Sequence, residues 1–94
     1  MIDKSSVAQP QLSPHVRYHW DSVRGQHQLL FPEGVLVLNQ SSAAIIQRCD
    51  GRQLATLIDE LAREFPGATL TDDVHEFLQE MMYRGFVRDS SASD

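Results

Sequence analysis

The pattern of hydrophobic and polar positions changes once along the chain, from short runs to a helical period. Between residues 16 and 38, β-branched, aromatic and leucine residues form short runs that turn residues interrupt, which is typical of β-strands. Antiparallel hairpins are expected because the turns are short and Gly25 is free to take a positive φ. The predicted strands are residues 16–20, 26–31 and 35–38, with turns at residues 21–25 and 32–34.

The third predicted strand is apolar at all four positions, which are Val35, Leu36, Val37 and Leu38. A strand with one face in water normally alternates apolar and polar residues, so neither face of this strand suits exposure to water. A helix is expected directly after it, and the strand can therefore lie at the sheet edge with unpaired backbone N–H and C=O groups. Such an edge invites the pairing of another strand.

A helical period begins after Asn39, whose side chain can cap a first helix, and Asp50 and Gly51 supply the stop of that helix. The apolar positions of this first helix spread over more than half of its circumference, so it should be the inner helix. A second, amphipathic helix is expected over residues 54–65, where a Pro-Gly pair ends it.

A third helix is expected to begin near Thr69 or Thr71, either of which can cap it, and to end at Gly85. Its apolar residues recur at helical spacing and form one stripe. Methionine is common where a surface must accept varied peptides, and two methionines extend this stripe beyond what one core face needs. The stripe consists of Leu70, Val74, Phe77, Leu78, Met81 and Met82.

The order of these elements predicts a small α+β domain of winged-helix type, with three N-terminal antiparallel β-strands followed by three α-helices. A chain of 94 residues can build one core, so a single domain over residues 15–88 is expected, with a short strand at residues 86–87 near its end. Residues 1–14 are polar, contain two prolines and show no period, which indicates a flexible N-terminal arm. The polar segment 89–94 is interpreted as a flexible tail.

The charge distribution argues against a nucleic-acid partner. The chain carries 8 Lys and Arg against 13 Asp and Glu, and residues 49–94 hold four of the arginines and ten of the acids. In a winged helix the third helix would enter the major groove, yet residues 72–84 carry four acids against one arginine. This half of the chain repels phosphate, so nucleic-acid binding is not expected.

No set of residues points to catalysis, a cofactor or a metal ion. His15, His19, His27 and His75 share no recognised ligand spacing with Cys49. Cys49 is the single cysteine, so no intramolecular disulfide can form, and a buried, inert thiol is expected there. The longest apolar run has four residues and no secretory signal is recognisable, so a cytoplasmic protein without a membrane span is expected.

Several short segments between Pro14 and Val87 carry a combined signature. They read WDSVRG, LLFPEGVLVLN, AAIIQRCDG, DVHEFL and RGFV, together with the spaced Ile58, Leu61 and Phe65. In this order and spacing they resemble the PqqD family. The resemblance implies a role in the biosynthesis of pyrroloquinoline quinone (PQQ), a redox cofactor made from the precursor peptide PqqA. Members of the family are described as non-catalytic peptide chaperones that bind PqqA and present it to the radical S-adenosylmethionine enzyme PqqE.

The resemblance also implies a binding mode, in which the leader peptide adds as a strand to the third β-strand and lies against the third helix. The exposed edge could instead pair with a second copy of the chain, so a homodimer is an open alternative. One departure is Gln53, where relatives usually have a Thr that can cap the second helix, and this helix is expected to start raggedly. The implied peptide-binding residues are Val35, Leu36, Val37, Leu38, Val74, Phe77, Leu78, Met81 and Met82.

Three classes of function follow from these observations. The leading hypothesis is a non-catalytic peptide-binding adaptor. The first alternative is a winged-helix transcriptional regulator or another protein-interaction module, and the second is a small metal-dependent enzyme. Binding to phosphate groups weakens steeply with salt, whereas strand addition with apolar anchoring does not, so a salt titration separates the adaptor from the regulator.

Overall fold

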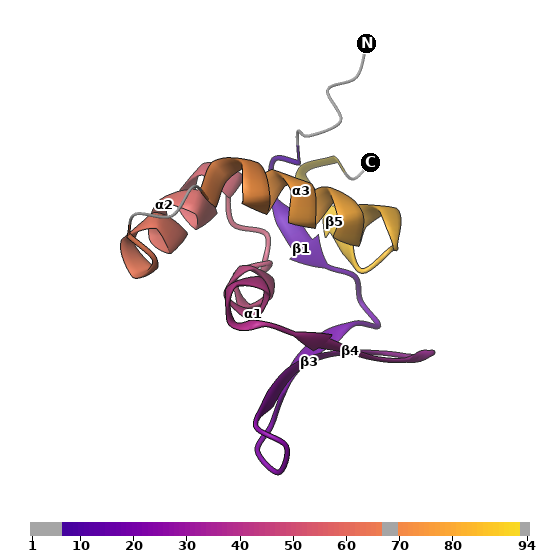
Figure 1. Ribbon diagram of the computed structural model, residues 1–94. Helices are drawn as coiled ribbons and strands as arrows, with labels where there is room; N and C mark the ends of the chain where they lie inside the picture. Colours follow the sequence, from indigo (N-terminus) through magenta and orange to yellow (C-terminus); the bar gives the residue numbers. More distant parts are fainter. Residues whose placement is uncertain (1–6, 67–69, 93–94) are drawn as a thin grey trace.

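A computed structural model describes residues 7–66 and 70–92 of the chain (Figure 1). The α+β prediction is confirmed, since the predicted hairpins and helices are present in the predicted order. The predicted start of the third helix at Thr69 lies outside the described residues. The elements are β1 (Pro10–Leu12), β2 (Arg17–Asp21), β3 (Gln26–Phe31), β4 (Gly34–Leu38), α1 (Gln40–Gln47), α2 (Leu54–Glu64), α3 (Leu70–Tyr83), β5 (Val87–Asp89) and a 3-10 helix, Ser90–Ala92.

The two predicted hairpins form one antiparallel sheet in the order β2-β3-β4. Tyr18 lies opposite Leu29, and Leu29 lies opposite Leu36, so these three side chains share one face of the sheet. Helix α1 packs against all three strands on this face (Figure 1). Gly25 ends the first turn with a φ of 65°, as its position predicts.

The hydrophobic core lies between this sheet face and the pair formed by α2 and α3, with α1 in the middle (Figure 1). Four consecutive residues of α1 are buried, which confirms that it is the inner helix. The largest fully buried side chains come from β1, β3 and each of the three α-helices: Pro10, Leu29, Ile46, Leu57, Leu61, Val74 and Leu78. Because α1 is covered on both sides, its position fixes how α3 sits relative to the sheet.

The predicted N-terminal arm is wrong over its second half. Residues 10–12 form β1, which pairs antiparallel with β5 in a second, two-stranded sheet. Val7 is 5% exposed and Pro10 is fully buried. Residues 7–13 thus form a packed segment, which we call the N-terminal strap, while residues 1–6 lie outside the described residues. The predicted tail likewise begins inside the fold, because Asp89 belongs to β5 and the 3-10 helix follows it.

The strap is held mainly through its backbone. The Leu12 N–H donates to the Cys49 carbonyl at 3.0 Å, and the Pro10 carbonyl accepts from the Gly51 N–H at 2.9 Å. These bonds connect the strap to the loop between α1 and α2. On the other side, the hydroxyl of the buried Ser13 donates to the Gly85 carbonyl at 2.7 Å. The strap therefore joins the helical layer to the last strand of the domain.

The helix starts differ in how they are capped. The Asn39 side chain accepts from the Ser42 N–H at 2.8 Å, which confirms the predicted cap of α1. Gln53, which precedes α2, makes no side-chain cap bond. Instead, the first N–H of α2, that of Leu54, donates to the Ala8 carbonyl at 2.8 Å. The strap thus supplies one of the acceptors that the start of α2 would otherwise lack.

Candidate functional site

Strand β4 is an open edge of the three-stranded sheet. It pairs with β3 on one side and with no described strand on the other, which confirms the predicted edge position. Its side chains alternate: Leu38 is 6% exposed and Leu36 is half-buried, whereas Val35 and Val37 are 53% and 55% exposed. The strand therefore presents unpaired backbone groups next to two apolar side chains in water.

One stripe of the surface of helix α3 is buried in the core. Val74, Leu78 and Met81 are each at most 3% exposed. At 100° per residue, Phe77 and Met82 are about 140° apart around the helix, one on each flank of this stripe. Phe77 is half-buried and Met82 is 37% exposed. Phe77 and Met82 therefore cannot both line the same side of a peptide-binding groove, although the sequence pattern placed them in one stripe.

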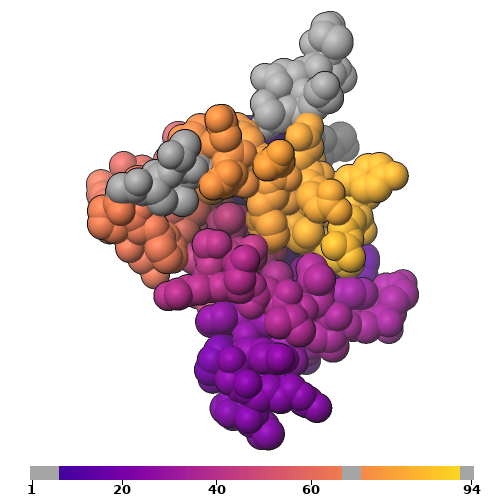
Figure 2. Space-filling view, viewed as in Figure 1, coloured from indigo at the N-terminus to yellow at the C-terminus, as the bar shows by residue number. Residues whose placement is uncertain are grey.

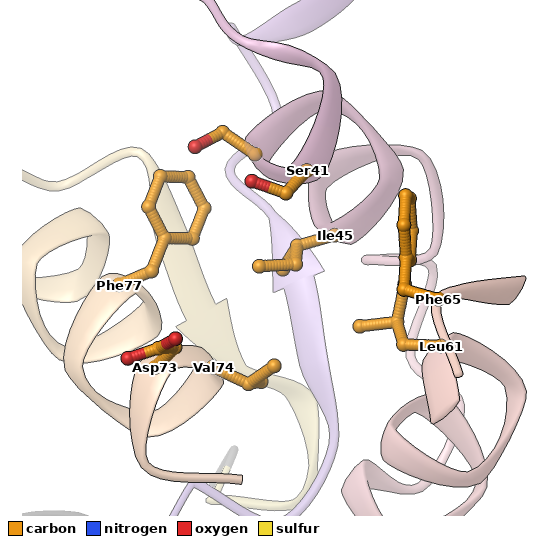
Figure 3. Close-up of a pocket in the computed structure, with 8 residues that line it drawn as sticks. Ser41, Ile45, Leu61, Phe65, Asp73, Val74 and Phe77 are labelled. Carbon is orange, nitrogen blue, oxygen red and sulfur yellow. The ribbon is translucent and has the colours of Figure 1, made fainter. Parts of the chain in front are cut away.

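The flank of α3 that carries Phe77 runs along β4 and the start of α1. Just after α3, the ring of Phe86 lies 4.5 Å from the ring of Phe31, the last residue of β3. Farther back along α3, Phe77 faces Ser41, in the first turn of α1, across a pocket (Figure 3). Strand β4 connects these two contact points, and Figure 2 shows α3, in orange to yellow, against the magenta segment that includes β4.

We call the cavity beside Phe77 the α3 pocket. It has a volume of about 340 Å³ and opens to solvent between the start of α1, the end of α2 and the first half of α3. Buried aliphatic side chains form its floor, and Ser41 and Asp73 lie at its exposed rim (Figure 3). The apolar floor suits an apolar side chain of a ligand, and the polar rim suits the polar backbone groups on either side of that side chain. The lining residues are Ser41, Ser42, Ile45, Leu61, Phe65, Asp73, Val74 and Phe77.

The nine predicted peptide-binding residues divide into three groups in the structure. Four are buried in the core: Leu38, Val74, Leu78 and Met81. Two are half-buried, Leu36 and Phe77, and three are exposed, Val35, Val37 and Met82. Only Val74 and Phe77 line the α3 pocket. The accessible part of the prediction is therefore β4 together with the Phe77 flank of α3.

Sequence reasoning missed the contributions of α1 and α2 to this pocket. Ser41 and Ser42 carry no apolar signal, and they reach the pocket only because α1 starts beside α3. Leu61 and Phe65 belong to the amphipathic face of α2, which points to a core position as much as to a pocket. Their spacing in the sequence was visible, but the opening beside them depends on the tertiary packing.

The charged residues near the site follow two patterns. The acids of α2 are paired: Glu60 and Glu64 accept from Arg48, with Nη2 of Arg48 2.9 Å from Glu64. By contrast, Asp73 at the rim of the α3 pocket is exposed and makes no ion pair with any residue that the structure describes. The pocket therefore carries negative charge that no basic side chain of the described residues neutralises.

The buried Cys49 is unreactive in this setting. Burial raises the pKa of its thiol to about 12, with a further contribution from the negative charge of Asp50, and its Sγ donates to the Ile45 carbonyl. Within residues 7–66 and 70–92, no three His, Cys, Asp or Glu side chains come together as metal ligands would. None of the helices in this part of the chain has the length and hydropathy that crossing a bilayer requires.

The sequence profile of the family described as "Coenzyme PQQ synthesis protein D (PqqD)" matches residues 26–87. The chain belongs to the PqqD family. A PqqA binding protein of Methylococcus capsulatus is 34% identical over 80 residues, which cover 84% of this chain and 86% of that protein. A PqqA binding protein of Klebsiella pneumoniae is 43% identical over 65 residues, which cover 67% of this chain and 71% of that protein. The matched PqqD segment includes β4 and α3, but not the N-terminal strap.

A solved PqqD structure has the same fold. The solution structure of the PqqD truncation of Methylobacterium extorquens PqqCD superposes with a TM-score of 0.74 over 93% of this chain and 99% of that one, at 20% sequence identity. That protein is described as a functional, stand-alone recognition element for ribosomally synthesised and post-translationally modified peptides. The PqqD fold is thus retained over nearly the whole chain, including the regions outside the matched segment.

Proposed function

We propose that this protein is a non-catalytic adaptor that binds the precursor peptide PqqA by strand addition and presents it to the radical S-adenosylmethionine enzyme PqqE. The observation that carries the proposal is the open edge of β4, with Val35 and Val37 exposed beside it. An extended peptide that joins this edge gains backbone hydrogen bonds and covers the two valines. Membership in the PqqD family and the relatives named PqqA binding protein support PqqA as the peptide.

The hydrogen-bonding phase of β4 decides which residues would hold the peptide. Backbone N–H and C=O groups of an antiparallel strand point alternately to its two sides. Phe31 and Gly34 flank the two-residue turn between β3 and β4, and such a closing pair normally bonds across the hairpin. By this alternation Leu36 bonds to β3, while Val35 and Val37 direct their backbone groups to the open edge. The peptide would therefore pair with Val35 and Val37.

Of the two edges of the sheet, β4 fits a peptide better than β2. The exposed side chains of β2 are Arg17, His19 and Trp20, two of them polar, and the shallow pocket that includes Arg17 is lined by residues of loops, β2 and β3. Strand β4 leads directly to the α3 pocket through Asn39 and Ser41. A peptide along β4 can thus place one apolar side chain in that pocket. Backbone pairing would supply much of the affinity, and the pocket much of the selectivity.

Chemical-shift mapping with 15N-labelled protein and unlabelled PqqA tests the binding site. Amide resonances of residues 35–38 and of Ser41, Asp73 and Phe77 should shift together and saturate at one peptide concentration. Resonances of the β2–β3 turn, residues 22–25, should stay within the experimental error. Saturable shifts confined to β2 or to the strap would place the peptide elsewhere and contradict the proposed site.

The adaptor role is tested with PqqE. The protein should increase the modification of PqqA by PqqE while turning over nothing by itself. Alanine variants at His15, His19, His27, His75 and Cys49 that remain folded should support modification within about twofold of the parent. A loss of a hundredfold or more in one such variant that still binds PqqA would indicate that the side chain takes part in chemistry, and the adaptor proposal would fail.

A further inference from the structure

The acids of α3 differ from those of α2 in making no ion pair within the part of the chain that the structure describes. On α2, Asp59 pairs with Arg63, and Glu60 and Glu64 pair with Arg48. On α3, four exposed acids make no ion pair with any described residue: Asp72, Asp73, Glu76 and Glu80. The helix dipole stabilises the unpaired carboxylates of Asp72 and Asp73, because both lie in the first turn of α3. The dipole does not stabilise the carboxylate of Glu80, which lies near the C-terminal end of α3.

Helical geometry divides these four acids into two pairs. Asp73 and Glu80 lie about 40° and 60° from Phe77 around the helix, on its flank, whereas Asp72 and Glu76 lie about 140° and 100° away, toward solvent. Asp73 lines the α3 pocket together with Phe77 (Figure 3). Along the helix axis, Asp73 is about 6 Å before Phe77 and Glu80 is about 4.5 Å after it. Along the helix axis, Phe77 thus lies between two acidic positions, both on the side of the ring that is turned away from the buried Val74, Leu78 and Met81.

The axial distances from Phe77 to Asp73 and to Glu80 are close to the distance between side chains on one face of an extended peptide. Side chains on one face of a strand recur every two residues, or about 6.6 Å. An apolar side chain next to Phe77 would therefore have its neighbours on the same face close to Asp73 and Glu80. Basic side chains at those positions would meet an opposite charge, and acidic ones would meet a like charge. The carboxylates are on a partly exposed surface, so they act on selectivity more than on affinity.

We propose that the Asp73, Phe77 and Glu80 face of α3 selects peptide segments in which an apolar side chain is flanked, two positions away on either side, by lysine or arginine. The inference rests on the proposed binding of a peptide along β4 and specifies the chemistry of the segment that occupies the α3 pocket. The apolar side chain enters the pocket beside Phe77, and the two basic side chains lie over the carboxylates. A segment with acidic residues at the same two positions is rejected.

Two synthetic peptides and two double variants test this selectivity. The peptides are acetyl-Thr-Lys-Thr-Leu-Thr-Lys-Thr-amide and the same peptide with both Lys replaced by Glu, each measured as a competitor of fluorescently labelled PqqA on the full chain. The variants are Asp73→Lys/Glu80→Lys and the control Asp72→Lys/Glu76→Lys. Both change the net charge equally and both remove one acid from the first turn of α3, so their effects on helix stability are matched.

The Lys peptide should compete at least tenfold better than the Glu peptide at 50 mM salt, and the ratio should shrink at 500 mM salt because screening weakens exposed charge pairs. The Asp73→Lys/Glu80→Lys variant should lose or reverse this preference, while the control pair keeps most of it. Equal competition by the two peptides, or equal loss in both double variants, would overturn the inference while labelled PqqA still binds. Failure of labelled PqqA to bind the parent protein would instead overturn the proposed function.

Discussion

The backbone N–H of Leu54 donates to the carbonyl oxygen of Ala8 at 2.8 Å, so the first residue of α2 is held by the N-terminal strap. A capping side chain would accept from the N–H of the second or third residue of the helix, and Gln53 makes no such bond, so the Ala8 carbonyl is an acceptor of a different kind at this helix start. The strap in turn is fixed by Asp89, whose carboxylate accepts from the Ala8 and Gln9 N–H groups at 2.9 and 3.0 Å. The start of α2 therefore depends on a residue near the other end of the chain.

Replacing Asp89 by Ala should destabilise the protein. The change removes the acceptor for the Ala8 and Gln9 N–H groups and for the hydroxyl of Ser91. We expect a loss of about 1–3 kcal/mol in the free energy of unfolding, measured by urea unfolding. Asp89→Asn keeps one side-chain acceptor oxygen and should lose less. Equal stability of the Ala variant and the parent at pH 7 would show that the Asp89 carboxylate contributes nothing to the stability of the fold.

The effect of Asp89 should depend on pH. Burial disfavours its charged form, but the hydrogen bonds from Ala8, Ser91 and Gln9 outweigh that effect and lower the pKa to about 2, from an ordinary value of 3.8. A group with a lowered pKa in the folded state stabilises the protein above its unfolded pKa and loses that contribution as the pH falls. The stability difference between parent and Asp89→Asn should therefore be constant above about pH 5 and decline from pH 4 to pH 2. A difference that grows on acidification would contradict this assignment.

Gln53→Thr should stabilise α2. A threonine hydroxyl at this position can accept from an N–H of the first turn, which the Gln53 side chain does not do. The expected gain is roughly 0.5–1 kcal/mol in the free energy of unfolding. Thermal unfolding followed by circular dichroism measures it, with Gln53→Ala as the control that should bring no gain. A Thr variant no more stable than the Ala variant would mean that a side-chain acceptor at this position adds nothing to the stability of α2.

Proline substitutions in β4 should separate peptide binding from folding. Val37→Pro removes an N–H that we expect at the open edge, so PqqA binding should weaken by roughly tenfold, from a net loss of about 0.5–1.5 kcal/mol and some strain. Leu36→Pro removes an N–H that we expect to bond to β3, so it should act mainly on stability. Isothermal titration with PqqA and thermal unfolding give the two readouts. Folded variants that both bind like the parent would exclude strand addition at β4.

Alanine at Phe77 should weaken PqqA binding more than alanine at Met82. Phe77 lines the α3 pocket, whereas Met82 lies on the opposite flank of the helix. An apolar contact with an aromatic ring suggests a loss of about 1–2 kcal/mol in binding free energy, or five- to thirtyfold in affinity, for Phe77→Ala. Met82→Ala and Met82→Asp should stay within about threefold of the parent. A larger effect at Met82 would move the peptide to the other side of α3.

Most of the fold could be predicted from local patterns, because each element has its own signal. Asn39 marks the start of α1, Gly25 marks a turn, and the apolar run of β4 marks an edge strand. Strand β1 has no such signal, since three residues are too few for a period and its partner β5 is far away in the sequence. The composition of the segment, with two prolines and polar residues, was typical of an arm, although Pro10 is fully buried.

For the candidate site, the sequence predicted which strand and which helix take part but not which of their side chains face the peptide. The sequence identified β4 and α3, but the side of α3 that faces β4 depends on how α1 and α2 pack beneath it. Phe77 and Met82 have the same apolar character in the sequence and differ only in their rotation around the helix. The pocket side chains from α1 and α2 follow from tertiary structure alone. Alternation in β4, in contrast, could be derived from the strand period once one buried residue, Leu38, was known.

The pairing of β1 with β5 also bears on how the protein is made. Gln9 and Asp89 are 80 positions apart, so during synthesis β1 cannot pair with β5 until residue 89 has emerged from the ribosome. Contacts of such long sequence separation are slow to form, and until then the Ala8 and Gln9 N–H groups lack their Asp89 acceptor. A nascent chain would thus carry the strap without its β5 partner until residue 89 is made. Translation that stops before Asp89 would yield a chain in which the strap, and with it the start of α2, lacks the carboxylate that holds Ala8 and Gln9.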